Sequence, residues 1–204
     1  MKLFVSTVSP FARLTLVSAL AAGIEELEIS VVNPWANPVA LESVNPFSQV
    51  PTFITDSGTT LLDTVVISRR LLGGDFLKND AEARTASFAL ILMEQLVKYH
   101  SLGRDQPKDA APHPHIARSR NAIIRALAKA PRFEPDSERF CQLALGIAFD
   151  YLQLRAPDIY QAHLGEGNLR AMQSFTARPW LRATSPAWLE EHMPTQLAEL
   201  RAVC

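Results

Sequence analysis

The pattern of hydrophobic residues changes once along the sequence, near residue 75. Before that point, short apolar and β-branched runs alternate with helical stretches and turn residues. After it, Leu, Ile, Phe and Ala recur three or four positions apart, and no strand signal stands out. The change predicts two domains: an α/β domain over residues 1–75 and an all-helical domain over residues 81–204, joined by a short linker.

Turn and capping residues set the order of elements in the first domain. Ser9 followed by Pro10 is typical of a helix start, and Asp63 stands in the same capping position before a second apolar helix that ends at Gly73. The turn residues 56–58 separate two strands of a hairpin. We expect strands over 3–5, 28–32, 50–55 and 59–62, with helices after Ser9 and Asp63. The order β-α-β-(α)-β-β-α is that of a thioredoxin-like domain.

Helical periodicity covers most of the second domain. We expect helices over 81–99, 114–130, 138–154 and 186–202. The apolar face of residues 86–97 is best explained by packing between helices.

Composition argues against several classes of partner. The net charge is −1, with acids and bases interleaved, so nothing favours nucleic acid or a membrane surface. No apolar stretch approaches the roughly 20 residues that cross a bilayer, and polar residues interrupt the N-terminal run that a secretory signal would need. Cys141 and Cys204 could pair, but free thiols in a cytoplasmic protein are the better interpretation, with Cys141 in a helical core.

Three short motifs follow one another in the first domain, and their order and spacing are informative. Residues 9–13 read Ser-Pro-Phe-Ala-Arg, residues 45–51 read Asn-Pro-Phe-Ser-Gln-Val-Pro, and Asp63-Thr64 opens a helix. This order resembles the N-terminal domain of the glutathione transferase family, in its bacterial S-P-F-x-R variant. In the second half, residues 145–152 look like the family's central helix, and residues 177–186 look like its A-R-P…T-x-P tail. The resemblance implies the glutathione transferase fold: an α/β thioredoxin-like N-terminal domain plus an all-α C-terminal domain.

The resemblance also implies where glutathione would bind. The main chain of Val50, before a cis Pro51, would hold the cysteinyl moiety. Asp63 and Thr64, at a helix N-terminus that favours anions, would hold the γ-glutamyl end. The glutathione-binding residues expected are Ser9, Phe11, Gln49, Val50, Pro51, Asp63 and Thr64. Simpler interpretations are an ordinary turn at Pro51, a cap at Asp63 and an exposed loop residue at Gln49.

Ser9 is the expected catalytic residue. A thiol with a pKa of about 8.5 is only a few per cent thiolate at neutral pH, and a hydroxyl that donates to the sulfur stabilises the anion. Ser9 could instead only cap its helix, and Ser6 offers a second hydroxyl. The first 98 residues contain no Tyr, which excludes a Tyr-activated site in the usual place. Arg13 is expected at the solvated surface or in an ion pair between domains.

The expected second substrate is a small hydrophobic electrophile. Its expected contacts are Met93, Leu96, Val97 and His100. No metal is expected, because His113 and His115 lack a third clustered ligand and fit a solvated loop. The family's Ser/Thr-x-x-Asp capping box is missing at residues 142–145, so the central helix is expected to start near Ser137.

The resulting hypothesis is a cytoplasmic, homodimeric glutathione S-transferase that stabilises the glutathione thiolate and conjugates it to hydrophobic electrophiles. Glutathione is the co-substrate, and no metal, nucleic acid or membrane partner is expected. Dimerisation is implied by the resemblance alone. The alternatives are a non-catalytic binding or regulatory protein of the same fold, and a glutathione-dependent isomerase, although the fuller Ser/Cys motif of such isomerases is absent from the first turn.

Overall fold

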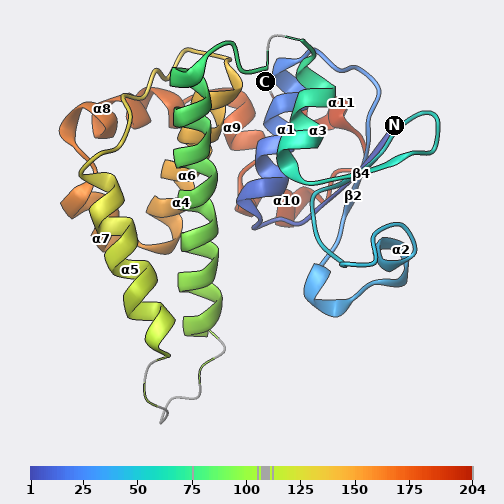
Figure 1. Ribbon diagram of the computed structural model, residues 1–204. Helices are drawn as coiled ribbons and strands as arrows, with labels where there is room; N and C mark the ends of the chain where they lie inside the picture. Colours follow the sequence, from blue (N-terminus) through green and yellow to red (C-terminus); the bar gives the residue numbers. More distant parts are fainter. Residues whose placement is uncertain (75, 105, 107–110, 112, 204) are drawn as a thin grey trace. The chain divides into compact units, whose positions relative to one another are not determined.

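The computed structural model describes residues 1–74, 76–104, 106, 111 and 113–203, and Figure 1 shows its elements. The chain forms two compact units: Met1–Phe76 together with Thr176–Cys204, and Leu77–Phe175. Residues 176–203, called the C-terminal tail below, thus group with the first unit, whereas the sequence had placed them in the second domain. Asp75 and Cys204 lie outside the described residues.

The first unit is built on a four-stranded sheet. Its elements are β1 (Lys2–Val5), α1 (Pro10–Ala21), β2 (Glu28–Val31), η1 (Pro34–Ala36), α2 (Val39–Glu42), β3 (Thr52–Ile54), β4 (Thr60–Leu62) and α3 (Thr64–Leu72). The strand order is β2-β1-β3-β4, with β1 parallel to β2 and antiparallel to β3. This arrangement confirms the predicted order of elements and the thioredoxin-like domain.

One hydrophobic core joins the sheet, two helices and the C-terminal tail. Leu3 pairs with Ile29 on one side and Phe53 on the other, so the three side chains share one face of the sheet. They pack in one cluster with residues of α1, α3 and the tail. The tail contributes Ala183, Leu189, Leu197 and Leu200, all of them fully buried. The first unit therefore needs the end of the chain to complete its core.

The tail contains three short helices, α9 (Pro179–Ala183), α10 (Pro186–His192) and α11 (Leu197–Arg201). The single helix expected over residues 186–202 is divided into α10 and α11. The prediction was wrong because Met193 ends α10 in the left-handed region (φ 43°) and Pro194 cannot continue a helix. Beyond this break the chain reaches the edge of β2, where the Ile29 N–H donates to the Thr195 carbonyl (2.8 Å).

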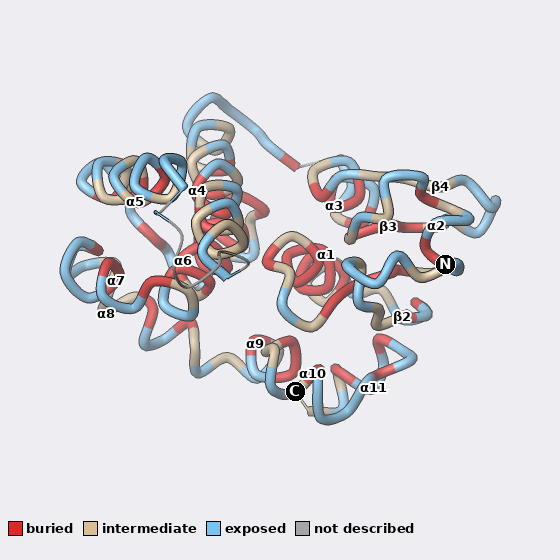
Figure 2. The backbone as a smooth tube through the Cα atoms, turned by 90° about the horizontal axis from the view of Figure 1, so that it is seen from below, coloured by how far each residue is buried: buried red, intermediate tan, exposed pale blue. Residues whose placement is uncertain are grey.

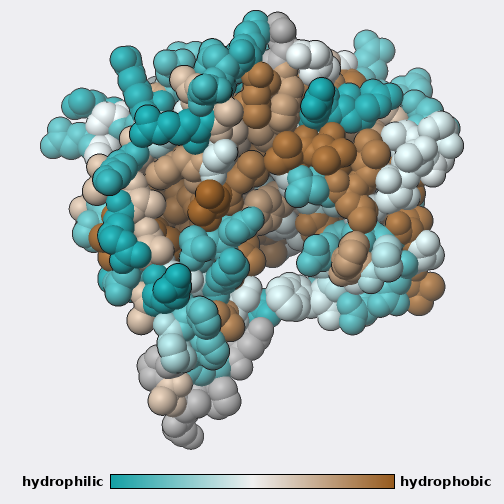
Figure 3. Space-filling model, in the orientation of Figure 1, coloured by the Kyte–Doolittle hydropathy of each residue, from teal (hydrophilic) through white to brown (hydrophobic). Residues whose placement is uncertain are grey.

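The second unit is helical throughout its described residues. Its helices are α4 (Asp80–Arg104), α5 (Pro114–Leu127), α6 (Phe140–Arg155), α7 (Pro157–His163) and α8 (Glu166–Thr176), the last ending in the first residue of the tail. The first three confirm the predicted helices, whereas α7 and α8 were not foreseen. Figure 2 shows α6 buried along most of its length. By contrast, α5 buries only one side, and its visible face is predominantly hydrophilic (Figure 3).

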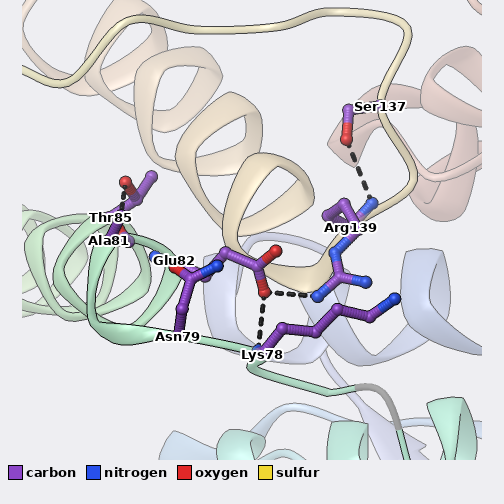
Figure 4. Close-up of polar contacts among 7 residues, drawn as sticks. All are labelled: Lys78, Asn79, Ala81, Glu82, Thr85, Ser137 and Arg139. Atoms are coloured by element: carbon purple, nitrogen blue, oxygen red, sulfur yellow. Dashed lines mark hydrogen bonds and ion pairs between the residues drawn. The ribbon is translucent and has the colours of Figure 1, made fainter.

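The start of α6 differs from the prediction. The helix begins at Phe140 with Arg139 as its N-cap, so a start near Ser137 is wrong; the Ser137 hydroxyl instead accepts from the Arg139 N–H (3.3 Å). Figure 4 shows the side chain of Arg139 in an ion pair with Glu82, whose carboxylate also accepts from the Lys78 N–H (2.9 Å). The first turns of α4 and α6 are therefore tied together.

None of the helices in the described ranges is both long and apolar enough to cross a membrane.

Candidate functional site

Ser9 caps α1, as the sequence predicted. Its Oγ accepts from the Ala12 N–H (3.2 Å), and its carbonyl accepts from the Arg13 N–H (3.0 Å). Within the part of the chain that the structure describes, no group accepts the hydroxyl hydrogen of Ser9. The side chain is partly exposed, so its O–H is oriented by the cap and remains able to donate to a ligand. Ser6, the alternative hydroxyl, is 7% exposed.

The Val50–Pro51 peptide bond is cis, which confirms the expectation for Pro51. Among the described residues, neither the N–H nor the C=O of Val50 has a hydrogen-bond partner. Asn45 holds the preceding loop in shape: its side-chain amide donates to the Gln49 carbonyl (3.0 Å) and to Thr52 Oγ1 (2.8 Å). The Val50 main chain is thus an open position beside the sheet, and a peptide can add to such a position by main-chain hydrogen bonds.

Two further features of this loop matter. The main-chain carbonyl of Gln49 also accepts from the Thr52 hydroxyl (2.7 Å). The side chain of Gln49 is exposed. Ser48 has a positive φ of 48°, unusual for a residue with a Cβ, and its buried Oγ has no partner in the described structure. Asn45 was recognised in the sequence only as part of a motif, and its role in organising the loop was missed.

Asp63 caps α3, again as predicted. Its carboxylate accepts from the Val65 N–H (2.7 Å), and its carbonyl accepts from the Ile67 N–H (3.1 Å). Thr64 is 4% exposed, and over the described ranges neither its hydroxyl nor its N–H is hydrogen-bonded. Because the N-terminal N–H groups of a helix carry partial positive charge, the start of α3 can hold a carboxylate.

The residues expected to contact the electrophile all lie on α4. Met93 and Leu96 are fully buried, whereas Val97 and His100 are partly exposed. The accessible members of the predicted set are therefore Val97 and His100. Phe11, in the first turn of α1, is also partly exposed.

The side chains considered for other chemistry have structural explanations. His113 Nδ1 accepts from the His115 N–H (3.2 Å), and their exposed rings stack at the start of α5. No group of three or more potential metal ligands occurs among the described residues. Cys141 is a buried free thiol, as expected; burial, followed by the charge of Glu82, raises its pKa, which disfavours a reactive thiolate there.

Arg13 does not lie at the solvated surface, which was one of the two positions predicted for it. It is only 6% exposed. Its Nη2 donates to the Leu181 carbonyl (2.7 Å), and its Nε donates to Thr184 Oγ1 (3.3 Å). Both acceptors belong to the C-terminal tail, so Arg13 joins α1 to the end of the chain.

Residues 8–72, which carry Ser9, the cis Pro51 and the start of α3, match the family model for the glutathione S-transferase N-terminal domain. This part of the first unit is similar to a glutathione S-transferase N-terminal domain. No curated protein gave a match to the chain.

Solved glutathione transferase structures share the fold over nearly the whole chain. A family member from Pseudomonas fluorescens Pf-5, with bound glutathione, is 23% identical, with a TM-score of 0.78 over 91% of this chain and 98% of its own. The glutathione S-transferase of Methylobacillus flagellatus KT, also with glutathione bound, is 22% identical, with a TM-score of 0.76 over 91% and 98%. Gtt2 from Saccharomyces cerevisiae is 14% identical, with a TM-score of 0.67 over 90% and 100%. The chain has the glutathione transferase fold.

Proposed function

We propose that the protein is a glutathione S-transferase in which the hydroxyl of Ser9 stabilises the glutathione thiolate for attack on hydrophobic electrophiles. The observation that carries the proposal is the state of Ser9: its oxygen is held by the cap of α1 while its hydrogen is not engaged within the described residues. The glutathione bound to the Pseudomonas and Methylobacillus proteins, which share the fold, supports the choice of ligand.

The chemistry follows from the low acidity of a thiol. A charge-assisted hydrogen bond contributes about 1.5–3 kcal/mol, which corresponds to about one to two pKa units for the group that becomes charged. A thiol whose pKa falls from about 8.5 by that amount is about a quarter to three quarters thiolate at pH 7, instead of a few per cent. The N-terminus of α1 adds to the effect because its partial positive charge favours an anion. Holding the thiolate beside the electrophile then supplies the gain from proximity.

In this proposal, separate parts of the first unit bind the different moieties of glutathione. The open N–H and C=O of Val50, next to Pro51, would pair with the cysteinyl main chain. The N–H and hydroxyl of Thr64 would hold the γ-glutamyl carboxylate, while the exposed Asp63 carboxylate would face the ammonium group. The Gln49 side chain would reach the glycyl end, and Phe11 would contact the tripeptide near Ser9.

We further propose Val97 and His100 on α4 as contacts for the electrophile, with Met93 and Leu96 packed behind them. A cytoplasmic location and a homodimer belong to the same proposal. Fractionation of cells that express the protein and sedimentation of the purified protein test these two points directly.

The decisive experiment compares wild type, Ser9→Ala and the matched control Ser6→Ala. Glutathione binding is measured by calorimetry, and the pKa of the bound thiol by its ultraviolet thiolate absorbance as a function of pH. We expect Ser9→Ala to retain glutathione but to raise the bound thiol's pKa by about one to two units, with a matching loss of conjugation rate. Ser6→Ala should leave the thiol's pKa unchanged.

Each other outcome has a definite meaning. A wild-type protein that does not bind glutathione refutes the whole assignment. Binding with no turnover on a broad panel of electrophiles favours the binding-protein alternative, and turnover only by isomerisation favours the isomerase. A thiol pKa that responds to Ser6→Ala and not to Ser9→Ala transfers the activating role to Ser6.

A further inference from the structure

The loop that carries Ser9 touches the C-terminal tail through two side chains. This loop, residues 6–9, joins β1 to α1. At its start, the Thr7 hydroxyl donates to the Glu190 carboxylate on α10 (3.2 Å). One helical turn after Ser9, Arg13 donates to Leu181 and Thr184. The same stretch of the chain is thus held by the tail on both sides of Ser9.

The contact made by Arg13 is the stronger of the two because it is buried and forked. The Nε and Nη2 atoms reach different acceptors, a geometry that the planar guanidinium provides and a lysine ammonium does not. Thr184 is fully buried; its hydroxyl accepts from Arg13 and donates to the Trp180 carbonyl (2.9 Å). The hydrogen bonds therefore run in one direction, from the Arg13 guanidinium through the Thr184 hydroxyl to the Trp180 carbonyl, and each donor has an acceptor.

Arg13 is coupled to Ser9 through the backbone. The Arg13 N–H donates to the Ser9 carbonyl (3.0 Å), and the neighbouring Ala12 N–H donates to Ser9 Oγ (3.2 Å). These two bonds form the first turn of α1 and set the direction of the Ser9 hydroxyl. A displacement of Arg13 would therefore displace the cap and the oxygen that faces the ligand.

The tail can act as a fixed support because it is anchored to the sheet independently of Arg13. The Leu197 N–H donates to the Leu27 carbonyl (2.9 Å), and the Ile29 N–H donates to the Thr195 carbonyl. Leu189 and Leu197 are fully buried in the core that contains β1 and β2. Because the C-terminal tail is anchored to the sheet and also hydrogen-bonded to the first turn of α1, it fixes that turn relative to the sheet.

We infer that the C-terminal tail positions Ser9. Arg13 is the positioning residue, because its bonds to Leu181 and Thr184 connect the tail to the first turn of α1. This inference rests on the proposed function of Ser9 and extends it to the end of the chain. The tail does not touch the ligand in this mechanism. It increases the stabilisation of the thiolate by restricting the orientations of the hydroxyl that donates to the sulfur.

The first test needs no glutathione. Thr184→Val preserves the shape of the side chain but removes the acceptor of the Arg13 Nε, while the bond from Nη2 to the Leu181 carbonyl remains. Thr85→Val is the matched control, because the Thr85 hydroxyl donates along its own helix, to the Ala81 carbonyl (3.0 Å) in the second unit. We expect Thr184→Val to speed hydrogen exchange of the Ala12 and Arg13 amides about five-fold, as for the loss of one net hydrogen bond. Unchanged exchange at both amides overturns the inference.

The second test measures the bound thiol. Thr184→Val and Arg13→Lys should each raise its pKa by about half a unit and lower kcat with little change in glutathione affinity, whereas Arg70→Lys, at an exposed position on α3, should change neither. If Arg13→Lys does not fold, Thr184→Val decides alone. A thiol pKa that moves in Ser9→Ala but not in Thr184→Val overturns the role of the tail and leaves the proposed function standing. A thiol pKa that does not move even in Ser9→Ala, or wild type that binds no glutathione, refutes both.

Discussion

Gly146 lies in α6 where two aromatic rings approach the helix backbone. A Cβ placed there would stand 2.4 Å from Phe175 Cζ, 2.6 Å from Phe175 Cε1 and 2.8 Å from Phe133 Cζ. Ordinary contacts of this kind measure 3.4–4 Å. The Gly146→Ala variant therefore requires the Phe175 ring to move by about 1 Å.

The rings have little freedom to move. Phe175 and Phe133 are 1% and 3% exposed and pack edge to face with their centroids 5.0 Å apart. Phe133 also packs edge to face against Phe149 (6.1 Å). Extra volume in such a core costs about 1–3 kcal/mol, while alanine in a helix gains about 1 kcal/mol over glycine. Because the contact distances are so short, we place the steric term near its upper end and expect a net loss of about 1–2 kcal/mol.

Urea unfolding followed by circular dichroism measures this free energy. The matched control is Gly167→Ala in α8, where an added Cβ would meet nothing within 4 Å; it should leave stability unchanged or raise it by a few tenths of a kcal/mol. Combining Gly146→Ala with Phe175→Leu should destabilise by less than the sum of the two single changes, since the smaller side chain makes room for the methyl group. A Gly146→Ala protein as stable as wild type, or more stable, would refute the reasoning.

Two further changes test the ion pair at the start of α4 and the strained loop before Val50. The hydrogen bond from the Lys78 N–H, followed by the bond from Arg139, lowers the pKa of Glu82 below its usual 4.5, so its contribution to stability is present above that value and is lost as pH falls through the lower folded-state pKa. Glu82→Gln should cost about 1 kcal/mol at pH 7 and flatten urea-derived stability against pH below about 5; an unchanged acid profile would contradict this. Ser48→Gly should raise the free energy of unfolding by about 0.5–1 kcal/mol, because glycine adopts the positive φ without strain and removes a buried unpaired hydroxyl; a lower melting temperature would show that the Ser48 side chain stabilises the loop.

The elements that the sequence predicted correctly are those with local signals. Ser9 before Pro10, the turn at residues 56–58, and Asp63 with Gly73 around α3 each use residues whose preference acts within one turn of chain. The short helices α7, α9 and α11 were not predicted as separate helices, although α7 and α9 begin with a proline and the Glu199 carboxylate accepts from the Gln196 N–H (2.9 Å) at the start of α11. A helix of five to seven residues is too short to be stable alone and forms because the surrounding packing holds it.

The same distinction applies to the candidate site. The caps at Ser9 and Asp63 could be predicted from the sequence, because donor and acceptor lie within three residues of each other. The role of Arg13 could not be predicted, since its partner Leu181 is 168 positions away and no neighbouring residue in the sequence indicates a buried partner. Asn45 lies between these cases: its bonds to Gln49 and Thr52 are short in sequence, but they follow no spacing that single-sequence rules describe.

The start of α6 illustrates how a missing local signal can be replaced by distant ones. The helix lacks the family's capping box, and the side chain of its N-cap residue Arg139 makes no capping hydrogen bond. Gln142, which stands where the box would begin, instead accepts from the Glu134 N–H (3.1 Å). Asn168 of α8 holds the same approach to the helix, accepting from the Phe133 N–H and donating to the Pro131 carbonyl, each at 3.0 Å.

Together with the ion pair between Glu82 and Arg139, these bonds order the segment leading into α6 from two other helices. A capping box satisfies backbone groups within one turn and leaves the helix free to form early in folding. The arrangement here becomes complete only when α4, α6 and α8 have come together, since Glu82 and Asn168 lie 57 and 35 positions from their partners. We therefore expect the start of α6 to become ordered as the second unit assembles, and not in a local event that precedes it.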